Sequence, residues 1–216
     1  FPNSFGNCAA CHVPAQAAHP GMEYQGDPSL AAGMEKEGIF CEFCHLVGDV
    51  IINPETSLPY ENMPGVISIQ LLRPANDGED LFLGNFDDVP GHDSYLPIYE
   101  ESVYCASCHF GIFWDTVVYN SYGEWLESSY SDPEDGQTCQ DCHMPPVDYD
   151  HFVYPEKGGL IRDPERIFSH DMTGYMENEL MQDAVSMTAE SNIKGDLLTV
   201  SVRITNDKTG HAVPTD

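Results

Sequence analysis

Basic side chains are scarce in this chain of 216 residues, which carries 8 Lys and Arg against 36 Asp and Glu. The formal net charge is -28 at pH 7, and no cluster of basic residues interrupts the excess of acid. Affinity for nucleic acid and for anionic lipid surfaces depends on Lys and Arg. The composition therefore argues against nucleic-acid binding and against direct binding to such membranes.

Long hydrophobic runs are also lacking. A transmembrane helix needs about 20 consecutive, mostly apolar residues, and the sequence contains no run of that kind. The first residues lack the basic segment and apolar segment of a secretory signal peptide. Because a cysteine motif begins at Cys8, we interpret Phe1 as a mature N-terminus left by signal removal.

Aliphatic side chains and Phe are too few for an ordinary core. Leu, Ile, Val and Phe make up 48 of the 216 residues. That share of about 22% is barely above the roughly 20% below which a highly charged chain is expected to be disordered. Either the chain is largely disordered, or something other than its side chains supplies the core.

Eight cysteines decide between these interpretations, and each belongs to a Cys-x-x-Cys-His motif. In this signature of c-type haem attachment, the thiols form thioethers and the His binds iron as the proximal ligand. A disulfide scaffold or a zinc protein explains paired cysteines, but neither explains a His after every pair. We therefore predict four covalently bound haems. The predicted attachment residues are Cys8, Cys11, Cys41, Cys44, Cys105, Cys108, Cys139 and Cys142, and the proximal ligands are His12, His45, His109 and His143.

Four haems would supply the core that the side chains do not, because porphyrin faces are large and mostly apolar. We expect a mostly irregular, loop-rich multihaem cytochrome with short helices, and an apoprotein that is unfolded. Because covalent haem attachment takes place outside the cytoplasm, we expect an extracellular or cell-surface location, with the periplasm as the alternative.

Five histidines remain for the distal sides of the four irons. The predicted distal ligands are His19, His92, His170 and His211, with His151 as the alternative. His19 follows His12 by seven residues and His151 follows His143 by eight. Either would have to pass round a porphyrin edge to reach the far side of its own haem. A neighbouring haem is the easier target, in this chain or in another subunit.

The spacing of the motifs predicts two dihaem modules. Motif starts are separated by 33, 64 and 34 residues, and Pro residues exclude helix from much of the long middle interval. The predicted regions are a first dihaem module over 1–60, a Pro-rich connecting segment over 61–104, a second dihaem module over 105–180 and a C-terminal β-hairpin region over 181–216.

Local patterns predict few regular elements. Residues 28–37 and 113–129 are the better helix candidates, and 66–71 is a candidate strand. Apolar and polar residues alternate over 197–204, which together with 184–189 predicts a β-hairpin. The chain stops soon after this hairpin, so we expect a truncated or processed form.

Two acidic clusters offer a further cofactor prediction. Asp77-Gly78-Glu79-Asp80 and Asp87-Asp88 carry carboxylate oxygens, which are the ligands that calcium prefers. A solvated acidic loop explains the same residues without a metal, so calcium is an addition to the predicted haem iron rather than a requirement.

Segments of the second half resemble multihaem cytochromes of the cytochrome c554 type. They are Cys139–Pro145, Ser169–Gly174 and Thr205–Thr215. The last is similar to that group's Asn-x-x-x-Gly-His-x-x-Pro-Thr-Gly, except that Asp216 replaces the final Gly. The resemblance covers about 92–216 and implies that His170 and His211 are distal haem ligands.

Four haems on a short secreted chain also resemble the subunits of extracellular cytochrome filaments, or nanowires. That resemblance implies a homo-polymer with haem-to-haem contacts, in which a His of one subunit binds a haem of the next. His19 is our candidate for this inter-subunit ligand, because it is poorly placed for its own haem.

We therefore expect electron transfer through four bis-His haems, without catalysis, to redox partner proteins or extracellular acceptors. The alternatives are a soluble periplasmic tetrahaem shuttle and a multihaem oxidoreductase for nitrogen or sulfur compounds. An oxidoreductase needs an iron with an open position, whereas the spare histidines outnumber the irons. Bis-His ligation predicts low reduction potentials, and the acidic charge lowers them further.

Overall fold

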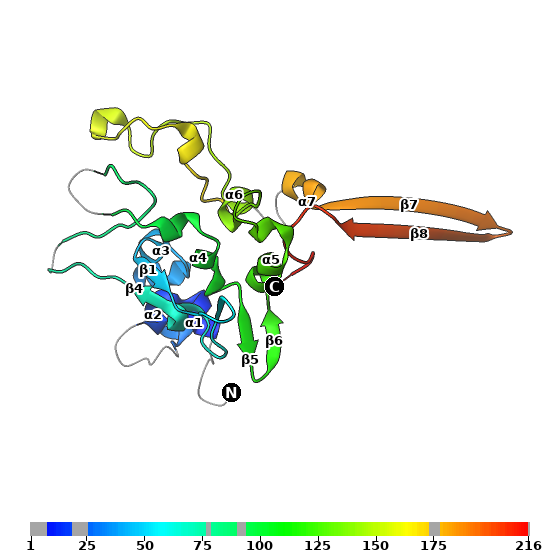
Figure 1. Ribbon diagram of the computed structural model, residues 1–216, viewed down its shortest axis with the longest axis horizontal. Coiled ribbons are helices and arrows are strands. Elements are labelled where there is room, and N and C mark those ends of the chain that lie inside the picture. The colour runs from blue at the N-terminus through cyan, green and yellow to red at the C-terminus, as the bar shows by residue number, and fades with distance from the viewer. Residues whose placement is uncertain (1–7, 19–25, 77–78, 90–93, 173–177, 216) are drawn as a thin grey trace. The chain divides into compact units, whose positions relative to one another are not determined.

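The computed structural model describes residues 8–18, 26–76, 79–89, 94–172 and 178–215 (Figure 1). It is loop-rich, with short helices and 3-10 turns, small two-stranded sheets and a C-terminal β-hairpin, which confirms this part of the predicted fold class. Two compact units are present, Phe1–Gly123 with Asp216, and Glu124–Thr215. Three cysteine motifs lie in the first unit and one in the second. The predicted dihaem modules concern haem pairing and stay a prediction.

The α-helices span one or two turns each. They are α1 (Ala9–His12), α2 (Pro14–Ala17), α3 (Cys41–Cys44), α4 (Val103–Ala106), α5 (Ser121–Glu127), α6 (Cys139–His143) and α7 (Asn178–Ala184). The 3-10 helices are Pro28–Leu30, Gly33–Glu37, Gly65–Ser68, Pro97–Glu100, Ser129–Ser131, Pro155–Lys157 and Pro164–Arg166. Helices of this length are marginal alone, so their packing must hold them.

Residues 28–37 form two 3-10 helices, and the prediction of one α-helix there is wrong. The carboxylate of Asp27 accepts the Ser29 N–H at 2.8 Å and caps the first. Non-helical backbone at Ala31 and Ala32 then separates the first 3-10 helix from the second. The second helix begins at Gly33, whose φ of 56° no α-helix contains.

The strands pair into separate two-stranded antiparallel sheets in the described part of the chain. The pairs are β1 (Val47–Val50) with β4 (Ile69–Leu71), β2 (Ile52–Asn53) with β3 (Leu58–Pro59), β5 (Gly111–Phe113) with β6 (Thr116–Tyr119), and β7 (Val185–Lys194) with β8 (Leu197–Asn206). Of the strand predicted over 66–71, only the last three residues are strand, because 65–68 forms a 3-10 helix.

The β5–β6 hairpin replaces the first part of the helix predicted over 113–129. Its turn residues Trp114 and Asp115 have φ of 51° and 59°, as a type I′ turn requires at both positions. Their N–H groups donate to Asn62 Oδ1 at 3.3 Å and to Glu61 Oε1 at 3.0 Å. These partners, which lie far away in the sequence, stabilise a turn that lacks the Asn-Gly pair typical of type I′ turns.

The apolar core of the first unit is small and lies where the motif helices meet. Its buried members are Ala9, Ala10, Ala17, Phe43 and Val66. Ala9 and Ala10 separate the cysteines of the first motif, and Phe43 lies between those of the second. The motifs are therefore part of the core and not appended to it.

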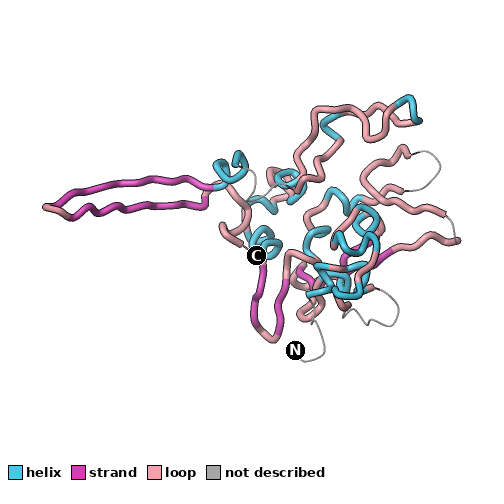
Figure 2. The backbone as a smooth tube through the Cα atoms, turned by 180° about the vertical axis from the view of Figure 1, so that it is seen from behind, coloured by secondary structure: helices cyan, strands magenta, loops and turns pink. Residues whose placement is uncertain are grey.

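The C-terminal hairpin is the longest regular element among the described residues, and the prediction of a hairpin there is confirmed (Figure 2). β7 and β8 pair residue for residue from Val185 with Asn206 to Lys194 with Leu197. Gly195 provides the turn at a φ of 64°. One face of the hairpin carries exposed apolar side chains, namely Met187, Ile193, Leu198, Val200, Val202 and Ile204.

Candidate haem-binding sites

Each Cys-x-x-Cys-His motif lies along one turn of helix. In chain order, the motifs occupy α1, α3, α4 and α6 and the residues next to them. The N–H of His45 donates to the Cys41 carbonyl and that of His109 to the Cys105 carbonyl, both at 3.0 Å. Residues three and four apart share one helix face, so both thiols and the imidazole of a motif project to the same side.

Most residues between the cysteines face the other way, into the protein, whereas Glu42 and Asp141 are exposed. Ala106 and Ser107 of the third motif are 0% and 2% exposed, and Gln140 of the fourth is 8% exposed. By contrast, Cys8 and Cys41 are exposed, the other six cysteines are half-buried, and none of the eight forms a disulfide. Thiols on the outer side of a motif helix suit covalent attachment of a flat apolar group.

The pKa of the second thiol is shifted from its ordinary value in all four motifs, upward in three of them. Burial raises the pKa of Cys44 and of Cys142. A hydrogen bond with Cys11, together with burial, raises the pKa of Cys108, and the same bond lowers the pKa of Cys11. The S–H of such a thiol would add across a vinyl double bond of a bound haem without an oxidant.

Four described histidines have Nδ1 bonded to an oxygen that accepts a hydrogen bond. Nδ1 then donates that bond, and Nε2 is the ring nitrogen through which such a histidine would bind a metal. The pairs are His45 with the Leu83 carbonyl, His151 with Asp150 Oδ1 at 2.7 Å, His170 with the Phe168 carbonyl at 3.0 Å, and His211 with the Ala212 carbonyl at 2.9 Å.

The second unit brings His143 and His211 together. Their ring centres are 6.1 Å apart and their planes differ by 16°. A metal ion binds an imidazole nitrogen at about 2.0 Å, so two imidazoles on opposite sides of one ion have ring centres about 6 Å apart. His143 belongs to a cysteine motif and His211 does not, as expected for a proximal and a distal ligand. The pair therefore fits a bis-His iron.

Three hydrogen bonds fix the backbone around His211. Asn206 Nδ2 and Thr209 Oγ1 each donate to its carbonyl oxygen at 2.7 Å. The N–H of Ala212 donates to Glu124 Oε2, also at 2.7 Å. Sequence reasoning missed Glu124, because nothing in the local sequence indicates that this carboxylate lies beside residue 212.

The imidazole of His45 is oriented by two aromatic rings. Its centre lies 3.9 Å from that of Phe82 and 5.7 Å from that of Tyr99, and the planes are within 16° of parallel in both pairs. Both aromatic residues belong to the interval that the sequence marked only as a Pro-rich connecting segment. That segment therefore contributes to the second motif's surroundings.

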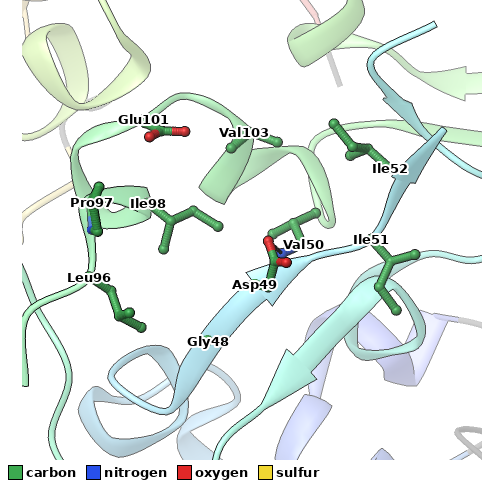
Figure 3. A pocket seen from close by; sticks show the side chains of 10 residues that line it. All are labelled: Gly48, Asp49, Val50, Ile51, Ile52, Leu96, Pro97, Ile98, Glu101 and Val103. Atoms are coloured by element: carbon green, nitrogen blue, oxygen red, sulfur yellow. Dashed lines mark hydrogen bonds between the residues drawn. The ribbon is translucent and has the colours of Figure 1, made fainter. Parts of the chain in front are cut away.

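A cavity of about 630 Å³ lies between β1 and the 3-10 helix that precedes α4. Figure 3 shows Val50, Ile98 and Val103 around it, with the carboxylates of Asp49 and Glu101 near its edge. Its volume falls within the range of about 300–1,000 Å³ that is typical of cofactor sites. Both polar and apolar surface lines it, and its lining residues lie close in sequence to the second and third motifs.

The structure describes only some of the other predicted ligands. His19 and His92 lie outside the described residues. His151 packs against Tyr154, with ring centres 5.3 Å apart, and His170 is exposed. Of the predicted calcium residues, Asp77 and Gly78 also lie outside, and the described chain contains no group of three or more His, Cys, Asp or Glu that would hold a metal ion by itself.

Comparisons with protein-family models, with curated proteins and with solved structures found no match to this chain. Among the described helices, none is long and apolar enough to cross a membrane.

Proposed function

We propose that the chain is a multihaem c-type cytochrome with four covalently attached haems. The proposal depends above all on the fourth motif, where the imidazoles of His143 and His211 lie 6.1 Å apart in nearly parallel planes. A haem iron bound there supplies one-electron chemistry by changing between ferric and ferrous states. The Cys-x-x-Cys-His spacing at all four motifs, with none of the eight cysteines in a disulfide, supports attachment at each of them.

Within this class, the more particular proposal is a subunit of an extracellular cytochrome filament that carries electrons and transforms no substrate. The chain would bind and orient each iron through two imidazoles and shield the porphyrin faces from water. His19 is the candidate ligand for a haem of the neighbouring subunit. Bis-His ligation and a net charge of -28 both favour the ferric state, so low potentials are expected.

Expression with covalent haem maturation tests the class. The intact mass of the mature chain should exceed that of the polypeptide by four haems, and the absorption spectrum should be low-spin in both oxidation states. Cys139→Ala combined with Cys142→Ala should reduce the covalent count to three. A mature chain that carries zinc or disulfides without covalent haem would overturn the proposal.

Electron microscopy of native material tests the filament. Continuous filaments are expected, and His19→Ala should shorten or abolish them while all four haems stay attached. Discrete particles at every protein concentration would reject the filament but would leave the class of protein intact.

A further inference from the structure

Glu124 of α5 contacts the segment that carries the candidate distal ligand of the fourth motif. Its carboxylate oxygen Oε2 accepts the Ala212 N–H at 2.7 Å and the Thr215 hydroxyl at 3.4 Å. A hydrogen bond to an ionised acceptor is stronger than one between neutral groups. Glu124 therefore ties α5 to the residues that follow His211.

Trp125, the next residue of α5, packs against the residue that precedes His211. A Cβ added at Gly210 would lie 3.0 Å from Trp125 Cδ1 and 3.2 Å from Tyr130 Cβ. Carbon atoms in favourable contact are about 3.5–4.0 Å apart, so a larger residue at 210 would push the loop away from the indole. Glycine thus allows the distal ligand segment to lie directly on Trp125.

The same indole also holds the segment that leads into the candidate proximal ligand. Trp125 Nε1 donates to the Gln137 carbonyl at 2.8 Å, and the Gln137 N–H donates to the Tyr130 carbonyl at 2.9 Å. Gln137 is followed by Thr138, which caps α6, the helix that ends at His143. Trp125 therefore contacts the segments of both candidate ligands.

We propose that Glu124 and Trp125 are positioning residues for the iron of the fourth motif, and that together they set the separation of its two imidazoles. As neighbours on one short helix, they hold the two ligand segments together and keep the ring centres of His143 and His211 6.1 Å apart. Partners that orient the ligands of a metal strengthen its binding without touching it. The proposal rests on the haem attachment proposed above.

Carbon monoxide measures this positioning in the reduced holoprotein, because it binds a bis-His haem only when a ligand detaches. Glu124→Ala removes the acceptor of the Ala212 N–H and should raise the rate of carbon monoxide binding at the fourth haem about tenfold, as expected for the loss of a hydrogen bond to a charged group. Glu124→Gln keeps an acceptor oxygen and should restore most of the parent rate. Glu127→Ala, which removes an exposed carboxylate from the same helix, is the matched control and should leave the rate unchanged.

Trp125→Phe is a milder second variant, because it removes the indole N–H but keeps an aromatic ring. It should also accelerate carbon monoxide binding, whereas Trp114→Phe, in the exposed turn between β5 and β6, should not.

A double variant separates positioning from a general structural role. Once His211→Ala has removed the distal ligand, Glu124→Ala should change the rate no further. A further change in that background, or parent rates for both Glu124→Ala and Trp125→Phe, would overturn the positioning role. Fewer than four covalent haems in the parent would instead reject the proposed function.

Discussion

Hydrogen bonds to the backbone hold the loop after β8, which carries the imidazole of His211. Asn206 and Thr209 hold the carbonyl of His211, and the carboxylate of Glu124 holds the next N–H. Because these bonds hold the peptide group between His211 and Ala212 and do not involve the imidazole, a substitution of the His211 side chain alone should leave the loop in place. The ligand can therefore be tested separately from its support.

Replacing His211 by Ala should convert one of the four haems from low-spin to high-spin, because its iron loses the distal ligand. Electron paramagnetic resonance and absorption spectra measure the change. His211→Met should restore six-coordination and raise the potential of that haem. Lys208→Ala, an exposed change in the same loop, serves as the control. A His211→Ala protein that stays fully low-spin would contradict the assignment.

Removing the hydroxyl of Tyr104 should lower stability without loss of haem. Burial raises the pKa of this phenol, and its O–H donates to the Cys44 carbonyl at 2.9 Å. Loss of one such bond costs about 1 kcal/mol, so Tyr104→Phe should lower the guanidinium midpoint of the holoprotein. Tyr149→Phe, at an exposed position, should leave it unchanged. Equal midpoints for both variants would show that the bond contributes nothing.

At the scale of elements, the motif helices are too short to be stable alone, and α6 shows how the sequence supports one. The Thr138 hydroxyl accepts the Asp141 N–H at 3.3 Å, and the Asp141 carboxylate accepts the Thr138 N–H at 2.7 Å. This capping box fixes the start of the helix that carries the fourth motif.

Thr138→Val should therefore destabilise the fourth site. Valine keeps the shape of the side chain but loses the cap, which is worth about 1 kcal/mol. Thermal unfolding followed at a haem absorption band should show an earlier transition, with the covalent count still at four. Thr188→Val on the exposed hairpin is the comparison. If both variants unfold at the parent temperature, the cap does not limit stability.

Helices and strands could be predicted from the sequence only where a local residue pattern indicated them. The alternation over 197–204 indicated the hairpin correctly, because side chains alternate between the two faces of a strand. The β5–β6 hairpin was missed, because its turn depends on Asn62 and Glu61, some fifty residues earlier in the chain. Likewise, the sequence predicts haem attachment at the motifs, and that stays a prediction, whereas the contacts of Gly65 with Ser107 and of Tyr104 with Cys44 are long-range and leave no local signal.

Charge dominates at the scale of the whole molecule. Residues 185–208 contain three basic and three acidic side chains, so the rest of the chain carries the entire net charge of -28. Self-repulsion of this size destabilises a compact state. The hairpin is thus the one long element without excess charge in the described chain.

Salt should stabilise the holoprotein and raise its potentials. Raising the ionic strength from about 0.01 M to 0.1 M shortens the screening length from about 30 Å to 10 Å. Repulsion between carboxylates then weakens, and the ferrous state becomes less unfavourable. Thermal midpoints and redox titrations in sodium chloride measure both effects, and sodium sulfate at equal ionic strength separates screening from ion-specific effects. Midpoints that fall with added chloride would contradict this expectation.

The surroundings of Cys11 and Cys108 also bear on the order of events in biogenesis. Under the proposed function, an attachment enzyme must reach both thiols of a motif, yet in the closed unit Cys11 Sγ lies 3.9 Å from the Tyr119 hydroxyl and Cys108 directly follows two buried residues, Ala106 and Ser107. Ligation at the first and third motifs must therefore come before the chain closes. Pulse-labelled chains should become protease-resistant only after they acquire haem, and chains made without a haem supply should be degraded. The cofactors would then act as the template on which this polypeptide folds.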